Sequence, residues 1–368
     1  MSALSDQISS RRTFAIISHP DAGKTTLTEK LLLYSGSIQT AGSVKGKSSS
    51  KHAVSDWMDI EKQRGISVPS SVLQFNYDGC CVTILDTPGH QDFSEDTYRT
   101  LMAADAAVMV IDAAKGVEAQ TKKLFKVCTL RHIPIFTFVN KLDREARDPF
   151  DLMEEIESVL GIGTYPMNWP IGSGRNFRGV FDRQTRHVLA FEGEGRGNST
   201  KKVAEIEAEL GDNALDELIG ENNHENLMGD IELLDGAGDE LNLDDVAGGK
   251  LSPVFFGSAL TNFGVEPFLK EFLRLAPSPR AYIDQETEQP VEPTNPDFSG
   301  FVFKIQANMD KNHRDRIAFV RICTGKFERG MSAYHMQGER NLKLAVGTSM
   351  MADDRAIVDE AYAGDIVG

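Results

Sequence analysis

Two short stretches of this chain have the residue types and spacing that bind a nucleotide. The first, residues 18–25, ends in Gly23-Lys24-Thr25 and lies between an apolar run at 14–17 and a helix-like segment at 25–33. A strand, a tight loop of this kind and a helix form a phosphate-binding loop, because consecutive backbone N–H groups and the helix N-terminus attract anions. We expect Lys24 to contact the β- and γ-phosphates and the Thr25 hydroxyl to ligate Mg²⁺.

The second stretch, Asn140-Lys141-Leu142-Asp143, follows an apolar run at 133–139. Its residues would select which nucleotide base is bound. A carboxylate at Asp143 can accept hydrogen bonds from both the N1–H and the 2-amino group of guanine. Adenine presents neither donor. The two stretches together therefore predict a guanine nucleotide site.

Three further motifs occur in the order that such a site requires. Residues 86–90 follow the apolar run 81–85, so Asp86 lies at the carboxyl end of a strand, where it can hold Mg²⁺ through a water molecule. Residues 64–67 come before that strand, and Ser67 there would place a second hydroxyl on the metal. Residues 257–260 would back the guanine ring. Five motifs in one order make a chance match negligible, although Ser18 replaces the usual first glycine of the phosphate loop.

These motifs supply the candidate site residues. The residues expected to contact the nucleotide are Ser18, His19, Pro20, Asp21, Ala22, Gly23, Lys24, Thr25, Thr26, Asp86, Thr87, Pro88, Gly89, His90, Asn140, Lys141, Asp143, Ser258, Ala259 and Leu260. The residues expected to ligate Mg²⁺ are Thr25, Ser67 and Asp86.

The negative charge of the chain is local. The net charge is −16 over 368 residues, and residues 203–249 hold fifteen Asp and Glu with no Lys or Arg, which leaves about −1 for the remainder. The total alone would argue against a nucleic-acid binder, but its distribution removes that objection. We interpret the acidic run as a solvated helix face, with a docking surface for a basic partner as the alternative.

Cysteine usage and hydropathy predict a cytoplasmic protein without a membrane segment. The four cysteines, Cys80, Cys81, Cys128 and Cys323, lack metal-ligand spacing and are interpreted as reduced thiols. Residues 1–12 are polar and do not resemble a secretory signal, and no apolar stretch approaches the roughly 20 residues that span a bilayer.

Residues 13–160 alternate apolar strands with helical patterns, which predicts an α/β fold with a mostly parallel sheet. Helices are expected at 92–104, 118–130 and 150–160. Asp78-Gly79 separates two strand-like runs and indicates one antiparallel hairpin. The expected fold class is therefore α/β, a phosphate-loop domain whose mostly parallel sheet has one antiparallel strand and resembles the sheet of a GTPase domain.

The spacing of the motifs predicts a subdomain inserted into this domain. Between Asp143 and Ser258 lie 114 residues, more than one strand and two helices require. The predicted insertion covers about 161–250, with a β-like part at 176–191 and an acidic helical part at 201–246. The whole nucleotide-binding domain is expected to span residues 1–279.

A second, all-β domain is expected after a proline-rich linker at 280–297. Strand-like runs at 300–306, 316–323, 331–336 and 342–346 suggest a small β-barrel over residues 298–368. We expect this barrel to lack its last strand, because the sequence stops at what looks like the start of another strand.

These motifs resemble the translational GTPases, and His90 after Asp86-Thr87-Pro88-Gly89 is a hallmark of that group. The insertion is similar to that of elongation factor G-like members. The runs 55–58, 61–67, 300–310 and 313–316 resemble the peptide chain release factor 3 family, as do Ser18 and Ser67. The resemblance covers essentially the whole chain, and it implies that the C-terminal domain of the family is absent here.

The resemblance implies a ribosome-dependent GTPase of translation termination. Such an enzyme hydrolyses GTP to GDP and phosphate and promotes dissociation of codon-reading (class I) release factors after peptide release. Lys24 and His90 would be catalytic, with His90 orienting the attacking water. GTP or GDP with Mg²⁺ would be the bound groups. The partners would be the ribosome, through ribosomal RNA and stalk proteins, and class I release factors, with no DNA and no membrane.

Three alternatives remain at this point. The chain could be a translocase or ribosome-protection GTPase of the same group. It could be a phosphate-loop small-molecule kinase, against which the 140–143 motif argues. It could also be a guanine-nucleotide-sensing binding protein with little turnover, and guanine nucleotides with extra 3′ phosphates could compete for its site.

Overall fold

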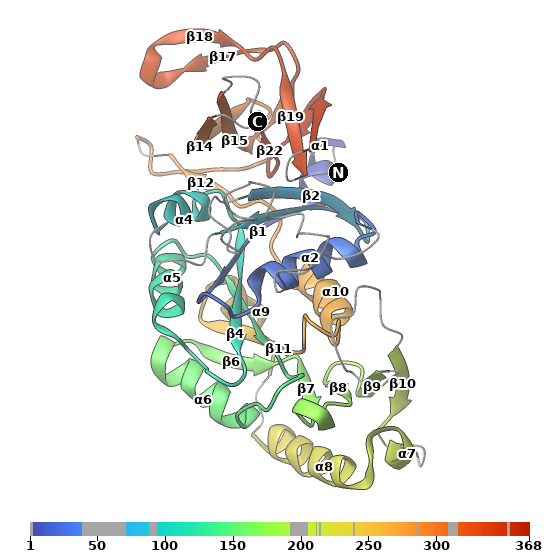
Figure 1. The fold of residues 1–368 in the computed structure, drawn as a ribbon. Helices are drawn as coiled ribbons and strands as arrows, with labels where there is room; N and C mark the ends of the chain where they lie inside the picture. The colour runs from blue at the N-terminus through green and yellow to red at the C-terminus, as the bar shows by residue number, and fades with distance from the viewer. Residues whose placement is uncertain are drawn as a thin grey trace.

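The computed structural model describes residues 3–38, 71–87, 94–191, 205–210, 212, 215–237, 240–284, 286–307, 316–351 and 354–368. Among them, a nine-stranded sheet in the order β20-β19-β2-β3-β1-β4-β5-β11-β6 forms the centre of the molecule (Figure 1). Its strands are β1 (Arg11–Ser18), β2 (Ser71–Tyr77), β3 (Cys80–Asp86), β4 (Ala106–Asp112), β5 (Ile135–Asn140), β6 (Gly163–Pro166), β11 (Leu251–Phe256), β19 (Gly347–Met351) and β20 (Asp354–Val358).

The strands from β3 to β6 run parallel, and β2 is antiparallel to β3. Asp78 and Gly79, which join β2 to β3, have φ angles of 46° and 74°, as a tight hairpin turn requires. The predicted α/β fold with one antiparallel hairpin is therefore confirmed.

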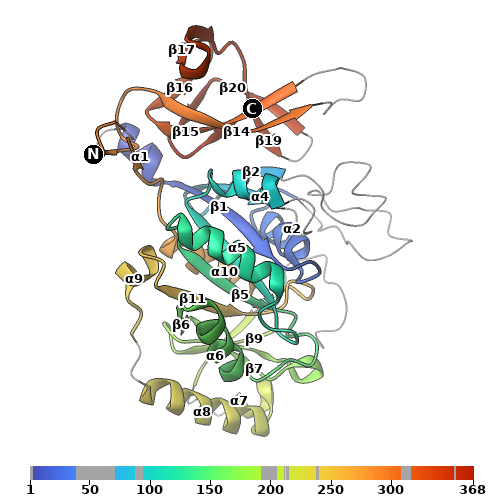
Figure 2. The same ribbon diagram turned by 90° about the vertical axis from the view of Figure 1, so that its left-hand side faces the viewer.

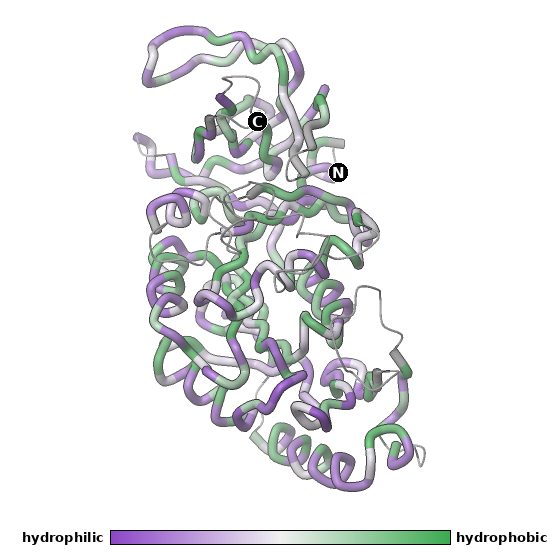
Figure 3. The backbone as a smooth tube through the Cα atoms, viewed as in Figure 1, coloured by the Kyte–Doolittle hydropathy of each residue, from purple (hydrophilic) through white to green (hydrophobic). Residues whose placement is uncertain are grey.

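Helices cover both faces of this sheet (Figure 2). On one face lie α2 (Lys24–Tyr34) and α10 (Val265–Leu275), and on the other lie α4 (Ser94–Leu101), α5 (Ala119–Leu130) and α6 (Pro149–Leu160). Because both faces are covered, the central strands are mostly apolar, and every residue of β4 is buried. Figure 3 shows hydrophobic stretches through the middle of the molecule.

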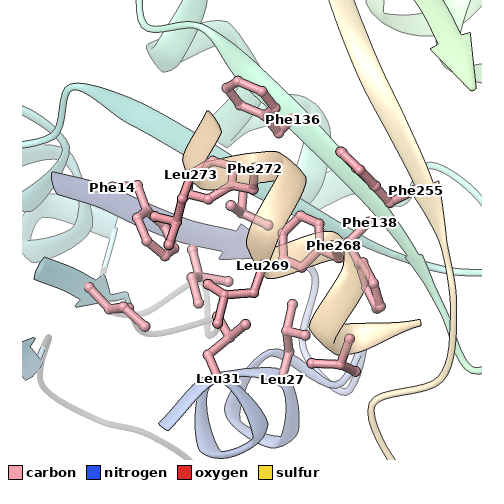
Figure 4. Close-up of a cluster of buried hydrophobic side chains, with 14 of the residues drawn as sticks. Phe14, Leu27, Leu31, Phe136, Phe138, Phe255, Phe268, Leu269, Phe272 and Leu273 are labelled. Atoms are coloured by element: carbon pink, nitrogen blue, oxygen red, sulfur yellow. The ribbon is translucent and has the colours of Figure 1, made fainter. Parts of the chain in front are cut away.

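The side chains of β1 alternate between the two apolar clusters. Phe14 and Ile16 lie in the cluster under α2 and α10, whereas Ala15 and Ile17 face α5. Figure 4 shows the first cluster, in which Phe272 of α10 meets Phe14 and Phe136 with ring centroids 4.5 and 4.9 Å apart. This packing fixes the carboxyl end of β1, from which the phosphate-binding loop begins.

The inserted region forms its own antiparallel sheet, in the order β10-β9-β8-β7. Its elements are β7 (Asn168–Ile171), the 3-10 turn η2 (Gly174–Asn176), β8 (Gly179–Asp182), β9 (His187–Phe191), β10 (Glu205–Glu209), α7 (Leu215–Ile219), α8 (Glu221–Gly236) and α9 (Leu243–Ala247).

One boundary and one element of this region differ from the sequence-based expectation. β6 lies within 161–250 yet pairs with β11 as an edge of the main sheet, so the main sheet extends past residue 161. Residues 205–209 were expected to be helical and form β10 instead. They pair with all five residues of β9, and this cross-strand pairing outweighs the helix preference of glutamate and alanine.

The C-terminal region is rich in short antiparallel strands. They are β12 (Tyr282–Ile283), β13 (Pro290–Val291), β14 (Ser299–Ala307), β15 (Arg316–Thr324), β16 (Lys326–Glu328), β17 (Ser332–His335), β18 (Arg340–Lys343), β21 (Glu360–Tyr362) and β22 (Ile366–Val367), with the 3-10 turn η3 (Met336–Gly338). The N-terminal helix α1 (Ala3–Ser9) packs against this region through Ile8.

The linker contains more structure than its proline content indicates. β12 and β13 form a small hairpin within residues 280–297. Asp284 Oδ1 accepts hydrogen bonds from the backbone N–H groups of Glu286 and Thr287, which closes the turn between the two strands. The predicted linker is therefore partly an ordered hairpin.

The C-terminal region joins the main sheet directly, because β19 pairs with β2, so residues 298–368 do not form the wholly separate all-β domain expected from the sequence. Buried polar groups add further contacts. Arg321 of β15 donates to Asp105, just before β4, at 2.5 Å, and both side chains are at most 3% exposed. Thr13 of β1 donates to the Gly364 carbonyl at 2.7 Å.

Within the described residues, no helix has both the length and the apolar character needed to span a bilayer.

Candidate functional site

The phosphate-binding loop lies between the end of β1 and the start of α2. Asp21 and Gly23 have φ angles of 65° and 100°, and Gly23 is the residue that precedes the first turn of α2. A Cβ atom at Gly23 would overlap Asn140 Nδ2, so glycine is required there both for its backbone conformation and for space. Thr25 and Thr26 lie in the first turn of α2, where backbone N–H groups are available to an anion.

Lys24 and Asp86 form a buried ion pair at the centre of the site. Lys24 Nζ donates to Asp86 Oδ1, and the two side chains are 6% and 1% exposed. Asp86 ends β3, which is the neighbour of β1 in the sheet, so the parallel register brings the two residues together. The other carboxylate oxygen of Asp86, Oδ2, is buried and has no hydrogen-bond partner among the described residues.

The next residue, Thr87, anchors the end of β3. Its hydroxyl donates to the Ile16 carbonyl of β1 at 2.6 Å. The other predicted residues of this part of the site, Ser67, Pro88, Gly89 and His90, lie outside the described residues.

Asn140 joins the phosphate loop to the segment predicted to back the base. Its Nδ2 donates to the Ala22 carbonyl at 2.9 Å, and its Oδ1 accepts from the Ala259 N–H at 2.9 Å. Asn140 is 2% exposed at the end of β5. One side chain thus links three loops at the carboxyl edge of the sheet, which is where ligands bind in folds of this kind.

Asp143 lies beside the same segment. Ser258 Oγ donates to Asp143 Oδ1 at 2.5 Å, and the Thr261 N–H lies 3.3 Å from Ser258 Oγ. The Asp143 side chain is 10% exposed, with Arg144 Nε 3.9 Å from its Oδ2. The carboxylate is therefore held in place by Ser258 at the edge of the site.

Lys141 connects the base motif with the phosphate loop. Its Nζ donates to the Asp21 carbonyl and lies 2.7 Å from Asp112 Oδ2 at the end of β4. Burial raises the pKa of Asp112, but hydrogen bonds from Lys141 and the Ala114 N–H outweigh it and hold the pKa below its usual value.

Two residues at this edge are not among the predicted site residues. Asp112 follows an apolar run, as Asp86 does, and that position was the available signal. Glu118 lies 3.4 Å from His19 Nε2, and no local pattern marks this contact because it joins two separate loops. The described residues of four predicted motifs, 18–25, 86–87, 140–143 and 257–260, thus lie together at this edge. The end of β4 lies there as well.

At one edge of the sheet lie a phosphate-binding loop, a strand that ends in an aspartate and an Asn-Lys-x-Asp motif. This combination defines the class of guanine-nucleotide-binding GTPases. The family model described as the Elongation factor Tu GTP binding domain matches residues 9–278, and the model described as Elongation factor G domain 2 matches residues 297–368.

Similar proteins identify one family within this class. Proteins named Peptide chain release factor 3 are 61% identical over 100% of this chain in Symbiobacterium thermophilum, 59% over 99% in Streptococcus sanguinis and 57% over 97% in Trichormus variabilis. The chain covers 69%, 69% and 66% of their lengths, respectively. A crystal structure of a Thermus thermophilus protein matches 97% of this chain with a TM-score of 0.75 at 26% identity, and the match covers 51% of that protein.

The chain therefore belongs to the peptide chain release factor 3 family of translational GTPases. The predicted family and the predicted GTPase class are confirmed.

Proposed function

We propose that this chain is the nucleotide-hydrolysing part of a ribosome-dependent termination factor. In this proposal it hydrolyses GTP to GDP and phosphate, and the reaction drives class I release factors from the ribosome after peptide release. The observation that supports it most directly is Asn140, whose side chain ties the phosphate loop to the base segment through two 2.9 Å hydrogen bonds. The relatives' shared name supports the termination step.

Each site residue has a distinct task in the proposed reaction. Lys24 neutralises charge on the β- and γ-phosphates, and backbone N–H groups of the phosphate loop and α2 hold their oxygens. Asp143 selects guanine, and Asn140 keeps the loops in register. His90 orients the attacking water, so its removal affects the chemical step more than binding.

The described residues fit a magnesium ion bound with the nucleotide. Bound Mg²⁺ would neutralise charge that develops on the phosphate oxygens. The free buried Oδ2 of Asp86 is an oxygen acceptor of the kind that Mg²⁺ prefers, directly or through water. Thr25, Ser67 and Asp86 are the proposed protein ligands.

The ribosome, through its RNA and stalk proteins, and class I release factors are the proposed partners, and the cytoplasm is the proposed compartment. The relatives named for peptide chain release support this assignment. Because the chain covers about two thirds of their length, the proposal concerns the activity that these residues carry within the termination factor.

The test measures GTP hydrolysis and release-factor dissociation on the same ribosomes. Post-release ribosomes carrying a fluorescent class I release factor are mixed with the chain and GTP. Faster phosphate formation together with loss of bound factor would support the proposal, with adenosine triphosphate as the matched control. Movement of messenger RNA without factor loss would point to the translocase alternative, and nucleotide binding without stimulated turnover would point to the sensing alternative.

A further inference from the structure

The end of β4 contacts the nucleotide site through one ion pair that the site motifs do not include. Lys141 Nζ lies 2.7 Å from Asp112 Oδ2, with side chains 15% and 6% exposed. The same ammonium group donates to the Asp21 carbonyl in the phosphate loop. Lys141 therefore has an acidic partner on one side and the phosphate loop on the other.

The Asp112 carboxylate is held in place by its own turn. Its Oδ1 accepts from the Ala114 N–H at 3.0 Å, and its carbonyl accepts from the N–H groups of Lys115 and Gly116 at 3.0 and 2.9 Å. Behind this turn, Glu155 of α6 accepts from the Val117 N–H at 3.1 Å. The carboxylate is thus fixed before any ligand arrives.

Lys141, by contrast, needs an external partner to hold its position. Its φ angle of 74° is in the left-handed region that non-glycine residues rarely adopt, and its long side chain has many rotamers to lose on ordering. The fixed, charged Asp112 supplies the attraction that selects the rotamer in which Nζ reaches the Asp21 carbonyl. Without that charge, the contact between the base motif and the phosphate loop loses its support.

We propose that Asp112 is a positioning residue of the nucleotide site, which holds Lys141 against the Asp21 carbonyl and so slows nucleotide release. The proposal rests on the proposed guanine nucleotide site. Asp112 acts through Lys141 and is assigned no contact with the nucleotide.

The test is a double-mutant cycle on the dissociation rate of a fluorescent GDP analogue, measured by stopped flow with the 368-residue chain. Asp112→Asn should release the analogue roughly tenfold faster, as expected when a charge-assisted hydrogen bond loses the carboxylate charge. Lys141→Met should have a similar effect, and Asp112→Asn added to Lys141→Met should change the rate no further.

Asp235→Asn is the matched control, because it removes a carboxylate that lies 2.9 Å from Arg186 on the exposed surface. It should release the analogue at the wild-type rate.

A wild-type rate for Asp112→Asn would overturn the proposal. So would rate increases that multiply in the double variant, because a purely structural role would act whether or not Lys141 is present. If Asp112→Asn does not fold, Asp112→Ser replaces it in the cycle, since serine still offers an oxygen to the Ala114 N–H.

Asp143→Asn separates this proposal from the proposed function. If Asp143→Asn loses guanine selectivity while the Asp112 variants behave as wild type, only the positioning role fails. If Asp143→Asn leaves GTP affinity unchanged, the guanine site itself is wrong, and the inference built on it fails as well.

Discussion

At the scale of single residues, the site depends on polar side chains that are buried and already paired. Asn140 uses both ends of its amide, Asp143 accepts from Ser258, and Lys24 pairs with Asp86. A buried polar group left without a partner costs about 1–3 kcal/mol, so each of these contacts constrains its neighbours. Substitutions here should therefore separate binding from chemistry.

Base choice is tested by Asp143→Asn. The substitution replaces one acceptor oxygen with an amide donor, which opposes the N1–H or 2-amino donor of guanine. The loss of a charge-assisted hydrogen bond, about 1.5–3 kcal/mol, should lower GTP affinity at least roughly tenfold. Xanthosine triphosphate affinity should rise, because xanthine presents an acceptor where guanine presents its amino group. Calorimetric titration with both nucleotides decides, and unchanged GTP affinity would contradict the assignment.

The roles of His90 in GTP hydrolysis and of Lys24 in GTP binding are tested by comparing His90→Ala with Lys24→Ala. His90→Ala should leave GTP affinity nearly intact and lower ribosome-stimulated hydrolysis by roughly a hundredfold or more, in the range that groups assisting proton transfer provide. Lys24→Ala should weaken binding itself, because it removes the charge that faces the phosphates and leaves Asp86 buried without its partner. Loss of binding in His90→Ala with normal turnover per bound nucleotide would make His90 a structural residue.

At the scale of elements, the junction between β1 and α2 is the most constrained part of the site. β1 is buried on both faces, α2 is covered by α10, and the loop between them must turn within residues 19–23. Gly23 makes this turn possible, since its φ of 100° and its contact with Asn140 exclude a side chain. The geometry of the anion site thus follows from the packing of two elements.

Gly23→Ala and Gly36→Ala form a matched pair for this junction. Both glycines have positive φ, at 100° and 78°, but a Cβ at Gly36 would have no other atom within 4 Å. Gly36→Ala should lose about 1 kcal/mol of stability from backbone strain, and Gly23→Ala should lose more, because its Cβ also disturbs the buried Asn140, both measured by thermal unfolding. Only Gly23→Ala should also lose more than roughly tenfold in GTP affinity, because its Cβ displaces Asn140. Equal affinities in the two variants would show that the Asn140 contact has no role in binding.

At the scale of the whole molecule, a buried ion pair joins the β-rich C-terminal region to the nucleotide-binding sheet. Arg321 donates to Asp105 and to the Gly364 carbonyl, and Gly364 also accepts from Thr13 of β1. Nearby, Arg11 Nε lies 2.8 Å from Asp365. Because β1 leads directly into the phosphate loop, the strand that carries the nucleotide site is also the strand held by the C-terminal region.

This junction is tested by Asp105→Asn. Removing one partner leaves the fully buried Arg321 charge without its counter-ion, which should cost about 3–5 kcal/mol. Arg321→Met alone should also destabilise the protein, and the double variant should be more stable than the sum of the two losses predicts. Thermal unfolding measures these effects, with Arg186→Met as the control for an exposed ion pair. Strictly additive losses would show that the two side chains do not interact.

Local sequence patterns specify the class of the nucleotide site and the parallel sheet that carries it. Residues 18–25 and 140–143 specify their chemistry through local spacing, and the apolar runs before them predict strands because a parallel strand buried on both faces needs no polar alternation. The Asp78-Gly79 hairpin is equally local, since its turn depends on two residues.

The distant residues that complete the site and hold the regions together come into contact only in the folded chain. Asp112 meets Lys141 because β4 and β5 are neighbours in a parallel sheet, and residues 205–209 become a strand because β9 offers them an edge. Asp105 and Arg321 are 216 positions apart and have no pattern that links them. Such contacts depend on the order of strands and the packing of regions, which arise from many residues together and are not encoded in any short segment.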